Sequence, residues 1–439
     1  MPTHRTIALL VLGLIARECF SFWTGHPFDF ELWVRLGYAM NHGGDPYGLL
    51  ASVPGLSFAN IFGYESAPTI AYLPFWPLVT GLMFALYSLT GVENRFVYYF
   101  LLKQPVILGD VLLAYLLCSY VSERKSAAAG RWVLSFWLFS PFTIIVSGIW
   151  GMFESIAICF LMISVGSKNR WGKSVWTGLA IFAKSIPIIY AAPVTLKRLT
   201  TRADVLALIL TIGLPSALSA AIFLLMKWPL MMVGETLAST VGKGGSSMSV
   251  WDILAYFNYT GGPVLPNETY QLLGFVWIPA LALFTLLAIR RFRTEIDNGL
   301  FQALIVCTLA FLIFKAQITE QYALYLFALT AVDVAVWHPE RKRLLVGSVA
   351  VALSYLVINN YFLVRFLAPV YPGFADFENA MFRVIGPLRY VLHLLLGTGF
   401  TCLNVAYLVS VFRQQSTSQG SQGLEEQSGL VGGVHERQP

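Results

Sequence analysis

Two carboxylates stand two positions apart near the start of the chain, in the stretch Phe28-Asp29-Phe30-Glu31. A carboxylate can act as a general base, because it takes up the proton of an acceptor hydroxyl as the oxygen attacks. The competing interpretation is a solvated pair at a helix start, where the helix dipole favours acids. Asp29 is our candidate catalytic base and Glu31 its candidate helper.

Three lysines in or beside apolar segments are candidates for binding an anionic phosphate. Lys184 stands at a proline-containing break, Lys243 in a long loop and Lys315 near the end of an apolar segment. Ionisable groups inside a membrane are costly and usually face a cavity or one another. Lys184 also fits a side chain that snorkels to a lipid headgroup.

Further aromatic and polar residues are expected on the same face as Asp29. They are Tyr72, Glu154, Glu320 and Gln321, which we predict to contact the substrate. Aromatic residues at such places often belong to the interfacial belt, but they also stack on sugar rings. No Ser-His-Asp or zinc-type spacing occurs. We expect no cofactor, because the lysines can stabilise a phosphate without a metal, although an Asp-x-Glu pair could hold a divalent metal.

The elements that must position these residues are membrane helices. Of the 439 residues, 57% are hydrophobic and 12% are charged, and the mean hydropathy is +0.67. Soluble proteins carry about 25% charged residues. Apolar runs long enough to cross the hydrocarbon layer recur along the chain, and inside lipid such runs form helices. The sequence predicts an all-α polytopic membrane protein.

Basic loops lie on the cytoplasmic side of membrane proteins. Simple alternation of twelve apolar segments does not place all of them there. The conflict disappears if 68–90, with Pro68, Pro74 and Pro77, and 175–195, broken at Lys184-Ser185-Ile186-Pro187, are interrupted or re-entrant segments, since proline breaks helices. We therefore expect about 10–12 membrane helices, with Asp29 on the lumenal or extracytoplasmic side.

The pattern after Asp29 alternates apolar and polar residues as far as Asn41, which predicts an amphipathic helix at the membrane surface in the first outer loop. Residues 1–413 read as one transmembrane domain, and the Gln/Ser/Gly-rich stretch 414–439 as a disordered polar tail. The net charge of +6 lies mostly in short loops, so membrane lipids rather than nucleic acid are the expected partners.

Several stretches, taken in order, resemble the polyprenyl-phosphate-sugar-dependent glycosyltransferases of the GT-C fold. The nearest in pattern are the GPI mannosyltransferase that adds the first mannose and the dolichyl-phosphate-glucose glucosyltransferases. The stretches are Phe28-Asp29-Phe30-Glu31, Gly44-Asp45-Pro46-Tyr47, Ala67–Tyr72, Lys103–Asp110, Ser140-Pro141, Trp150–Ser155, Gly178–Pro187 and Phe314–Tyr322. This chain differs from the family at two places. It has Asp-x-Glu where the mannosyltransferase has a pattern similar to Asp-x-Asp, and it has Glu154 where relatives often have Asp or Asn.

The resemblance implies a GT-C helical bundle that transfers a hexose, with mannose as the first candidate. The transfer would invert the configuration of the anomeric carbon. The donor would be a polyprenyl-phosphate-linked sugar and the acceptor a lipid-linked glycan or glycolipid. Asp29 matches the presumed base, and an accessory subunit is a possible partner. Two other classes stay open. One is a secondary transporter or flippase for a glycolipid or anionic solute, which shares broken helices and buried charges. The other is a non-catalytic scaffold.

Overall fold

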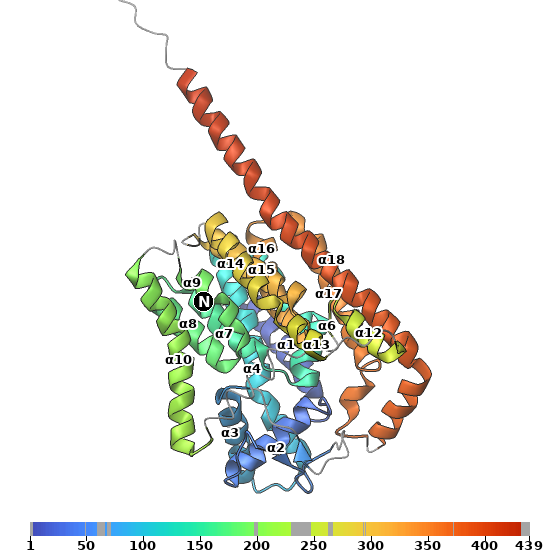
Figure 1. Cartoon of the computed structure of the whole chain (residues 1–439). Coiled ribbons are helices and arrows are strands. Elements are labelled where there is room, and N and C mark those ends of the chain that lie inside the picture. Colours follow the sequence, from blue (N-terminus) through green and yellow to red (C-terminus); the bar gives the residue numbers. More distant parts are fainter. Residues whose placement is uncertain are drawn as a thin grey trace, which may run out of the picture.

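The computed structural model describes residues 3–48, 50–58, 66–67, 72–196, 201–229, 247–261, 267–292, 294, 296–371 and 373–431. Almost all of the regular structure is helical, and two short strands pair in the first loop (Figure 1). The elements are α1 (His4–Ser21), α2 (Asp29–Asn41), β1 (Leu50–Ala51), β2 (Ser66–Ala67), α3 (Phe75–Leu89), α4 (Arg95–Arg124), α5 (Ala127–Phe139), α6 (Pro141–Ile144), η1 (Ile145–Trp150), α7 (Glu154–Gly166), α8 (Arg170–Ala183), η2 (Ile186–Tyr190), α9 (Ala191–Thr195), α10 (Arg202–Met226), α12 (Asp252–Thr260), α13 (Asn267–Phe275), α14 (Trp277–Arg291), α15 (Asp297–Phe314), η3 (Glu320–Tyr322), α16 (Ala323–Val336), η4 (Pro339–Arg341), α17 (Lys342–Asn359), η5 (Val364–Leu367) and α18 (Phe374–Val431).

Six helices of the described chain are long and apolar enough to cross a membrane, and a seventh span results if a pair bent by 50° at Ser140-Pro141 counts as one. They are α4, α10, the stretch Leu272–Arg291, α15, the stretch Pro339–Asn359 and Asp376–Arg413 within α18. This confirms the predicted all-α polytopic membrane protein. The count is below the expected ten to twelve because some apolar segments form helices too short to span, such as α7 with 13 residues.

The 30-residue helix α4 lies at the centre of the N-terminal half, where it packs against α1, α3, α5 and α7. Two buried cations fix its position. Arg17 of α1 donates to Asp110 of α4 over 2.6 Å, and both side chains are fully buried. Lys103 of α4 donates to the carbonyl oxygens of Thr24, Gly148 and Ile149 over 2.7–3.0 Å. These polar contacts are satisfied inside the bundle, as buried charges require.

The predicted break at Lys184 is confirmed. Helix α8 ends at Ala183, Lys184 has extended backbone angles, and η2 follows with Pro187 in its first turn. Proline lacks the amide proton that would continue the ladder of hydrogen bonds. The other predicted break lies partly outside the described residues, and α3 begins only at Phe75, directly after Pro74.

The predicted helix after Asp29 exists as α2, but it does not lie on the surface. Eight successive residues from Phe30 to Gly37 are buried, the charged Glu31 and Arg35 included. They can be buried because they stand four residues apart and pair with each other over 2.6 Å. The expectation of a surface-lying amphipathic helix is thus corrected to a buried helix that carries its own ion pair.

Helix α18 continues through Val431 and so enters the stretch for which the sequence predicts disorder. Each further residue of a helix adds one backbone hydrogen bond, so the helix can run past the packed part of the bundle (Figure 1). The division into one transmembrane domain and a polar tail stays a prediction.

Candidate active site

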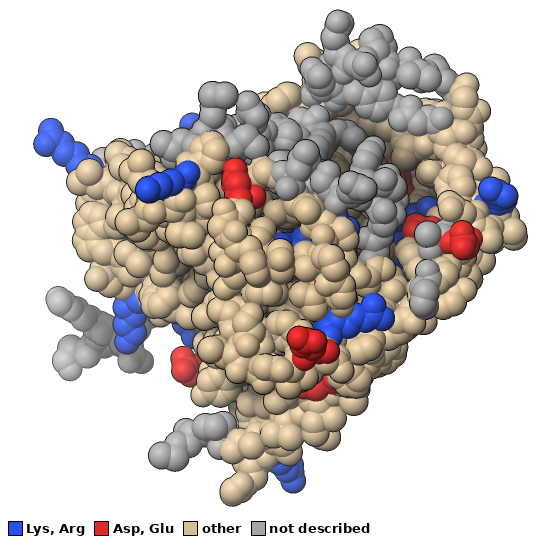
Figure 2. Space-filling model, turned by 90° about the horizontal axis from the view of Figure 1, so that it is seen from below, with Lys and Arg blue, Asp and Glu red and all other residues tan. Residues whose placement is uncertain are grey.

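Asp29 stands in the first turn of α2, at the end of the bundle that lies lowest in Figure 1. The indole Nε1 of Trp150 donates to Asp29 Oδ2 over 2.9 Å. The side chain of Asp29 keeps 18% of its surface exposed. Its second oxygen, Oδ1, accepts no hydrogen bond from the described residues, and so it is available to a hydroxyl. Figure 2 views this end directly and shows charged side chains scattered among uncharged ones.

His26 lies beside Asp29 and is neutral. Its Nδ1 accepts the backbone N–H groups of Phe28 and Asp29 over 3.3 and 3.2 Å, so the ring proton belongs on Nε2. Burial, followed by the charge of Arg365, holds the pKa of His26 well below its usual value. The 3.3 Å contact between His26 Nδ1 and Asp29 Oδ2 is therefore no ion pair. The lone pair of Nδ1 faces Asp29 Oδ2 and is already used by the two backbone N–H groups.

The surroundings raise the pKa of Asp29 from 3.8 to about 6. Burial is the largest cause, because it disfavours the charged carboxylate. The hydrogen bond from Trp150 and the charges of Lys184 and Arg365 act in the opposite direction, while Glu154 raises the pKa. A carboxylate whose pKa lies this close to neutrality is well matched to general base catalysis.

Lys184 and Glu154 form a buried ion pair next to Asp29. The lysine is also surrounded by aromatic rings, with its Nζ 4.4 Å from the ring centre of Phe153 and 5.2 Å from that of Tyr72. The other carboxylate oxygen of Glu154, Oε2, is buried and has no hydrogen-bond partner among the residues described. A buried acceptor without a donor is costly, and a substrate hydroxyl can satisfy it.

An apolar cavity of about 500 Å³ lies beside the break that follows Lys184. Isoleucines of α8 and η2, α10 residues and Phe311 of α15 line it, and Lys315 and Tyr322 supply polar groups. Tyr322 also lies near Lys184, with 5.9 Å between the lysine Nζ and the ring centre. Burial lowers the pKa of Lys315 to about 8. Tyr322 therefore lies both on the wall of the apolar cavity and beside the charged cluster around Asp29.

The structure brings together four of the residues singled out in the sequence, namely Asp29, Tyr72, Glu154 and Lys184. The others lie as follows. Both Glu31 oxygens are occupied, one by Arg35 and the other by the backbone N–H of Phe58 over 2.9 Å. Glu320 accepts from Asn359 over 2.6 Å, and Gln321 is buried next to it. Lys315 lines the apolar cavity, and Lys243 lies outside the described residues.

Three groups at the site were not singled out in the sequence: His26, Trp150 and Arg365. His26 stands three positions before Asp29, and Trp150 begins a stretch already noted, so spacing could have suggested both. No spacing or motif in the sequence indicated that Arg365 would lie near Asp29. It reaches the site because three successive residues before it, Tyr361, Phe362 and Leu363, have positive φ angles, and because Gly25 donates its backbone N–H to Phe366 over 2.9 Å.

Within the part of the chain that the structure describes, no three His, Cys, Asp or Glu side chains lie close enough together to hold a metal ion. Glu31 is committed to Arg35 and Phe58, so the Asp-x-Glu spacing does not present two free carboxylates. Function without a metal cofactor remains a prediction.

No protein-family model matches the chain. A search of curated proteins likewise finds no similar protein. Among solved structures, the chain is similar to ArnT from Cupriavidus metallidurans, crystallised with undecaprenyl phosphate, at 14% sequence identity and a TM-score of 0.47. The match covers 100% of this chain and 82% of that chain. A likeness of this strength does not by itself assign the chain to a family.

Proposed function

We propose that this membrane protein is a GT-C-type glycosyltransferase that takes its sugar from a polyprenyl-phosphate-linked donor. The observation that carries the proposal is the environment of Asp29: a largely buried carboxylate with a pKa of about 6, an Oδ1 that accepts no hydrogen bond from the described residues, and a buried lysine beside it. A base and a cation at one site suit the attack of a hydroxyl on a carbon that bears a phosphate leaving group.

In this mechanism Asp29 takes the proton of the acceptor hydroxyl. The oxygen forms a bond to the anomeric carbon while the bond from that carbon to the phosphate oxygen breaks. The electron pair leaves with the lipid phosphate, and the nearby ammonium group of Lys184 stabilises its charge. The attack from the side opposite the phosphate inverts the anomeric centre.

The apolar cavity beside the Lys184 break supports a lipid-linked donor. A polyprenyl chain needs an apolar space, and its phosphate needs a cation at the end of that space. The cavity offers both, because isoleucines line it and Lys315 and Tyr322 lie on its wall. The ring of Tyr322 bridges to Lys184. In the proposal, Lys184 and Lys315 bind the phosphate, with Lys243 as a third candidate.

The finer assignments rest on the sequence resemblance and on the loop charges. We propose that the sugar is a hexose, with mannose as the first candidate, and that the acceptor is a lipid-linked glycan or glycolipid. Tyr99, near the start of α4, packs against Phe30 beside Asp29, and Arg124 ends the helix 25 residues further on, a rise of about 37 Å. Basic loops such as the one that follows Arg124 are cytoplasmic. The site would then face the lumen or the cell exterior. Glu31, Glu320, Gln321 and an accessory subunit stay secondary candidates.

The test is sugar transfer from a labelled polyprenyl-phosphate sugar by the purified full chain carrying Asp29→Asn. General base catalysis is worth about 10²–10⁴-fold, so we expect a loss of that size. Asp376→Asn, an exposed acid on α18, is the matched control and should keep full activity. Full activity of Asp29→Asn would rule out the base assignment. Movement of intact donor across the membrane with no new glycosidic bond would favour the transporter.

The same variant has a second readout that shows whether it is folded. The folded chain binds the Asp29 proton more tightly than the unfolded chain, since its pKa is about 6 rather than 3.8. This difference costs the ionised folded protein about 3 kcal/mol at pH 7, and the cost disappears as the pH falls from 6 to 3.8. Asp29→Asn should therefore unfold at a higher temperature than wild type at pH 7. A lower temperature would contradict the buried-carboxylate argument.

A further inference from the structure

A groove of about 560 Å³ lies between α1 and α5, far from Asp29 along α1. The two helices run in parallel and touch at Gly13, where an added Cβ would lie 2.6 Å from Leu138. From there they separate toward their first turns, and the wedge between them is the groove. Its lining residues are Arg5, Ala8 and Leu9 of α1, and Ala128, Arg131, Trp132 and Ser135 of α5.

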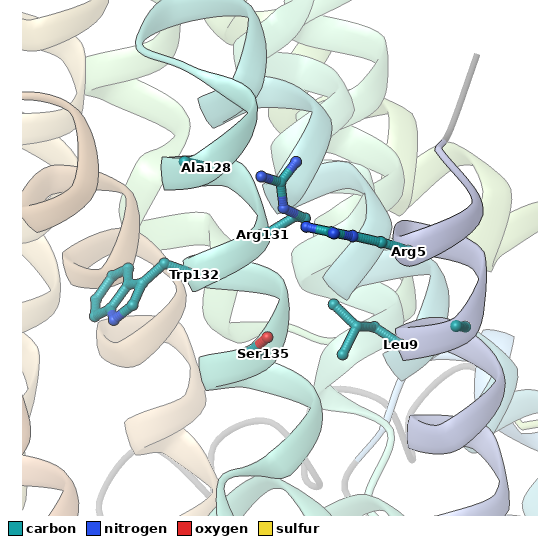
Figure 3. Close-up of a pocket in the computed structure, with 7 residues that line it drawn as sticks. Arg5, Leu9, Ala128, Arg131, Trp132 and Ser135 are labelled. Carbon is teal, nitrogen blue, oxygen red and sulfur yellow. The ribbon is translucent and has the colours of Figure 1, made fainter.

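Two arginines enter this groove from opposite sides. Figure 3 shows Arg5 and Arg131 reaching toward each other between the helices, with Leu9 below them. Neither forms an ion pair or hydrogen bond with any residue that the structure describes. Two guanidinium groups in one groove repel each other, and no carboxylate lies between them. An anion in that space would accept hydrogen bonds from both guanidinium groups and would remove their repulsion.

The helix ends increase the positive potential at this place. α1 and α5 both begin beside the groove, and neither carries an acidic residue in its first turn. A helix start is positive and binds anions through its free N–H groups. Both arginines thus lie near helix ends that disfavour cations. Trp132 turns to the other side of α5, where Lys342 lies 5.5 Å from its ring centre.

The groove continues into a surface suited to acyl chains. On α1 the residues that follow Arg5 and Leu9 on the same face include Leu12, which is 54% exposed. On α5 the face of Arg131 and Ser135 continues to Phe139, which is 39% exposed. Eight residues of helix separate Arg131 from Phe139, a rise of about 12 Å. A phosphate between the arginines would have lipid tails lying along these apolar faces.

We propose that this groove binds the headgroup phosphate of an anionic membrane phospholipid, held by Arg5 and Arg131. Basic pockets between membrane helices bind such headgroups in other proteins. The site is separate from the proposed donor cavity, which is lined by α8, η2, α10 and α15. It depends only on the chain being a membrane protein, and it holds whether or not the chain transfers a sugar.

The test is native mass spectrometry of the full chain, delipidated and titrated with phosphatidylglycerol in a non-ionic detergent. The double variant Arg5→Gln/Arg131→Gln should bind it about thirtyfold more weakly than wild type, and Arg5→Gln alone about fivefold. The matched control Lys125→Gln/Arg343→Gln removes the same charge from two exposed residues outside the groove and should change binding less than twofold. Phosphatidylcholine with the same acyl chains should bind weakly, and inorganic phosphate should not displace the lipid.

Three outcomes would overturn the proposal. The first is unchanged binding by both arginine variants, and the second is an equal loss in the control, which would mean general charge attraction. The third is displacement by inorganic phosphate alone, which would mean a free-anion site. Arg5 is exposed in the first turn of α1, so its single variant gives a result even if the double variant does not fold.

Discussion

The hydrogen bond from Trp150 to Asp29 offers the most direct test of how the site sets the pKa of its base. Trp150→Phe keeps a ring that can pack against His26 and Phe366, but it removes the indole N–H that lies 2.9 Å from Asp29 Oδ2. That N–H stabilises only the ionised carboxylate. Without it, the pKa of Asp29 must rise above its value of about 6.

The size of the shift follows from the strength of the bond. A hydrogen bond to a charged group contributes about 1.5–3 kcal/mol, which corresponds to roughly one to two pKa units. The pKa should therefore move from about 6 to roughly 7–8. With a shift of about 1.5 units, the ionised fraction at pH 6.5 falls from about three quarters to about one tenth. At pH 9 both enzymes are almost fully ionised.

The assay is the pH dependence of kcat/KM for sugar transfer, which reports the essential base of the free enzyme. Activity should rise with pH in both enzymes, and the rise should lie at higher pH in the variant. Trp76→Phe is the control, because Trp76 is a buried indole whose Nε1 has no partner in the described structure. Its profile should match wild type. A Trp150→Phe profile that stays in place, or moves to lower pH, would refute the reasoning.

The remaining predictions concern the partners of Asp29 and Lys184. His26→Phe removes the nitrogen lone pair that faces Asp29 Oδ2 at 3.3 Å and disfavours its negative charge, so the acid limb of the same profile should move to lower pH, by less than about one unit. Lys184→Met leaves Glu154 buried and unpaired, and it should lower the free energy of unfolding by about 3–5 kcal/mol. Lys184→Met/Glu154→Met should regain most of that stability but no activity, whereas regained activity would contradict a phosphate-binding role for the lysine. Transfer should continue in excess EDTA, since the donor phosphate is stabilised by lysines, and a full loss that Mg²⁺ restores would show that a metal is needed.

Local sequence patterns predicted those parts of the fold that depend on residues close together in the sequence. The break at Lys184 follows from Pro187, whose missing amide proton ends the helix. The helix after Asp29 follows from its apolar spacing, but its burial does not. Glu31 and Arg35 are four residues apart, and that spacing alone could have indicated an ion pair rather than a second catalytic acid.

The site itself depends on contacts between distant residues. Glu154 and Lys184 are 30 residues apart. The sequence around neither residue indicates that the two form an ion pair. Trp150 reaches Asp29 across 121 residues. Arg365 acts on Asp29 through a turn of three left-handed residues that no proline or glycine marks. Such groups become visible only after packing has brought their helices together.

The π-helix η1 ends at Trp150. The direction in which the Trp150 side chain points depends on how many residues this helix contains. Its wider turn ends at Gly151, whose φ angle is +90°, and Lys103 binds the carbonyl oxygens of Gly148 and Ile149 within it. The wide turn already accommodates one extra residue, so inserting another would rotate everything beyond by about 100°. The bond to Asp29 is then lost even though no participating side chain has changed. In this segment, insertions are therefore far more damaging to the site than substitutions.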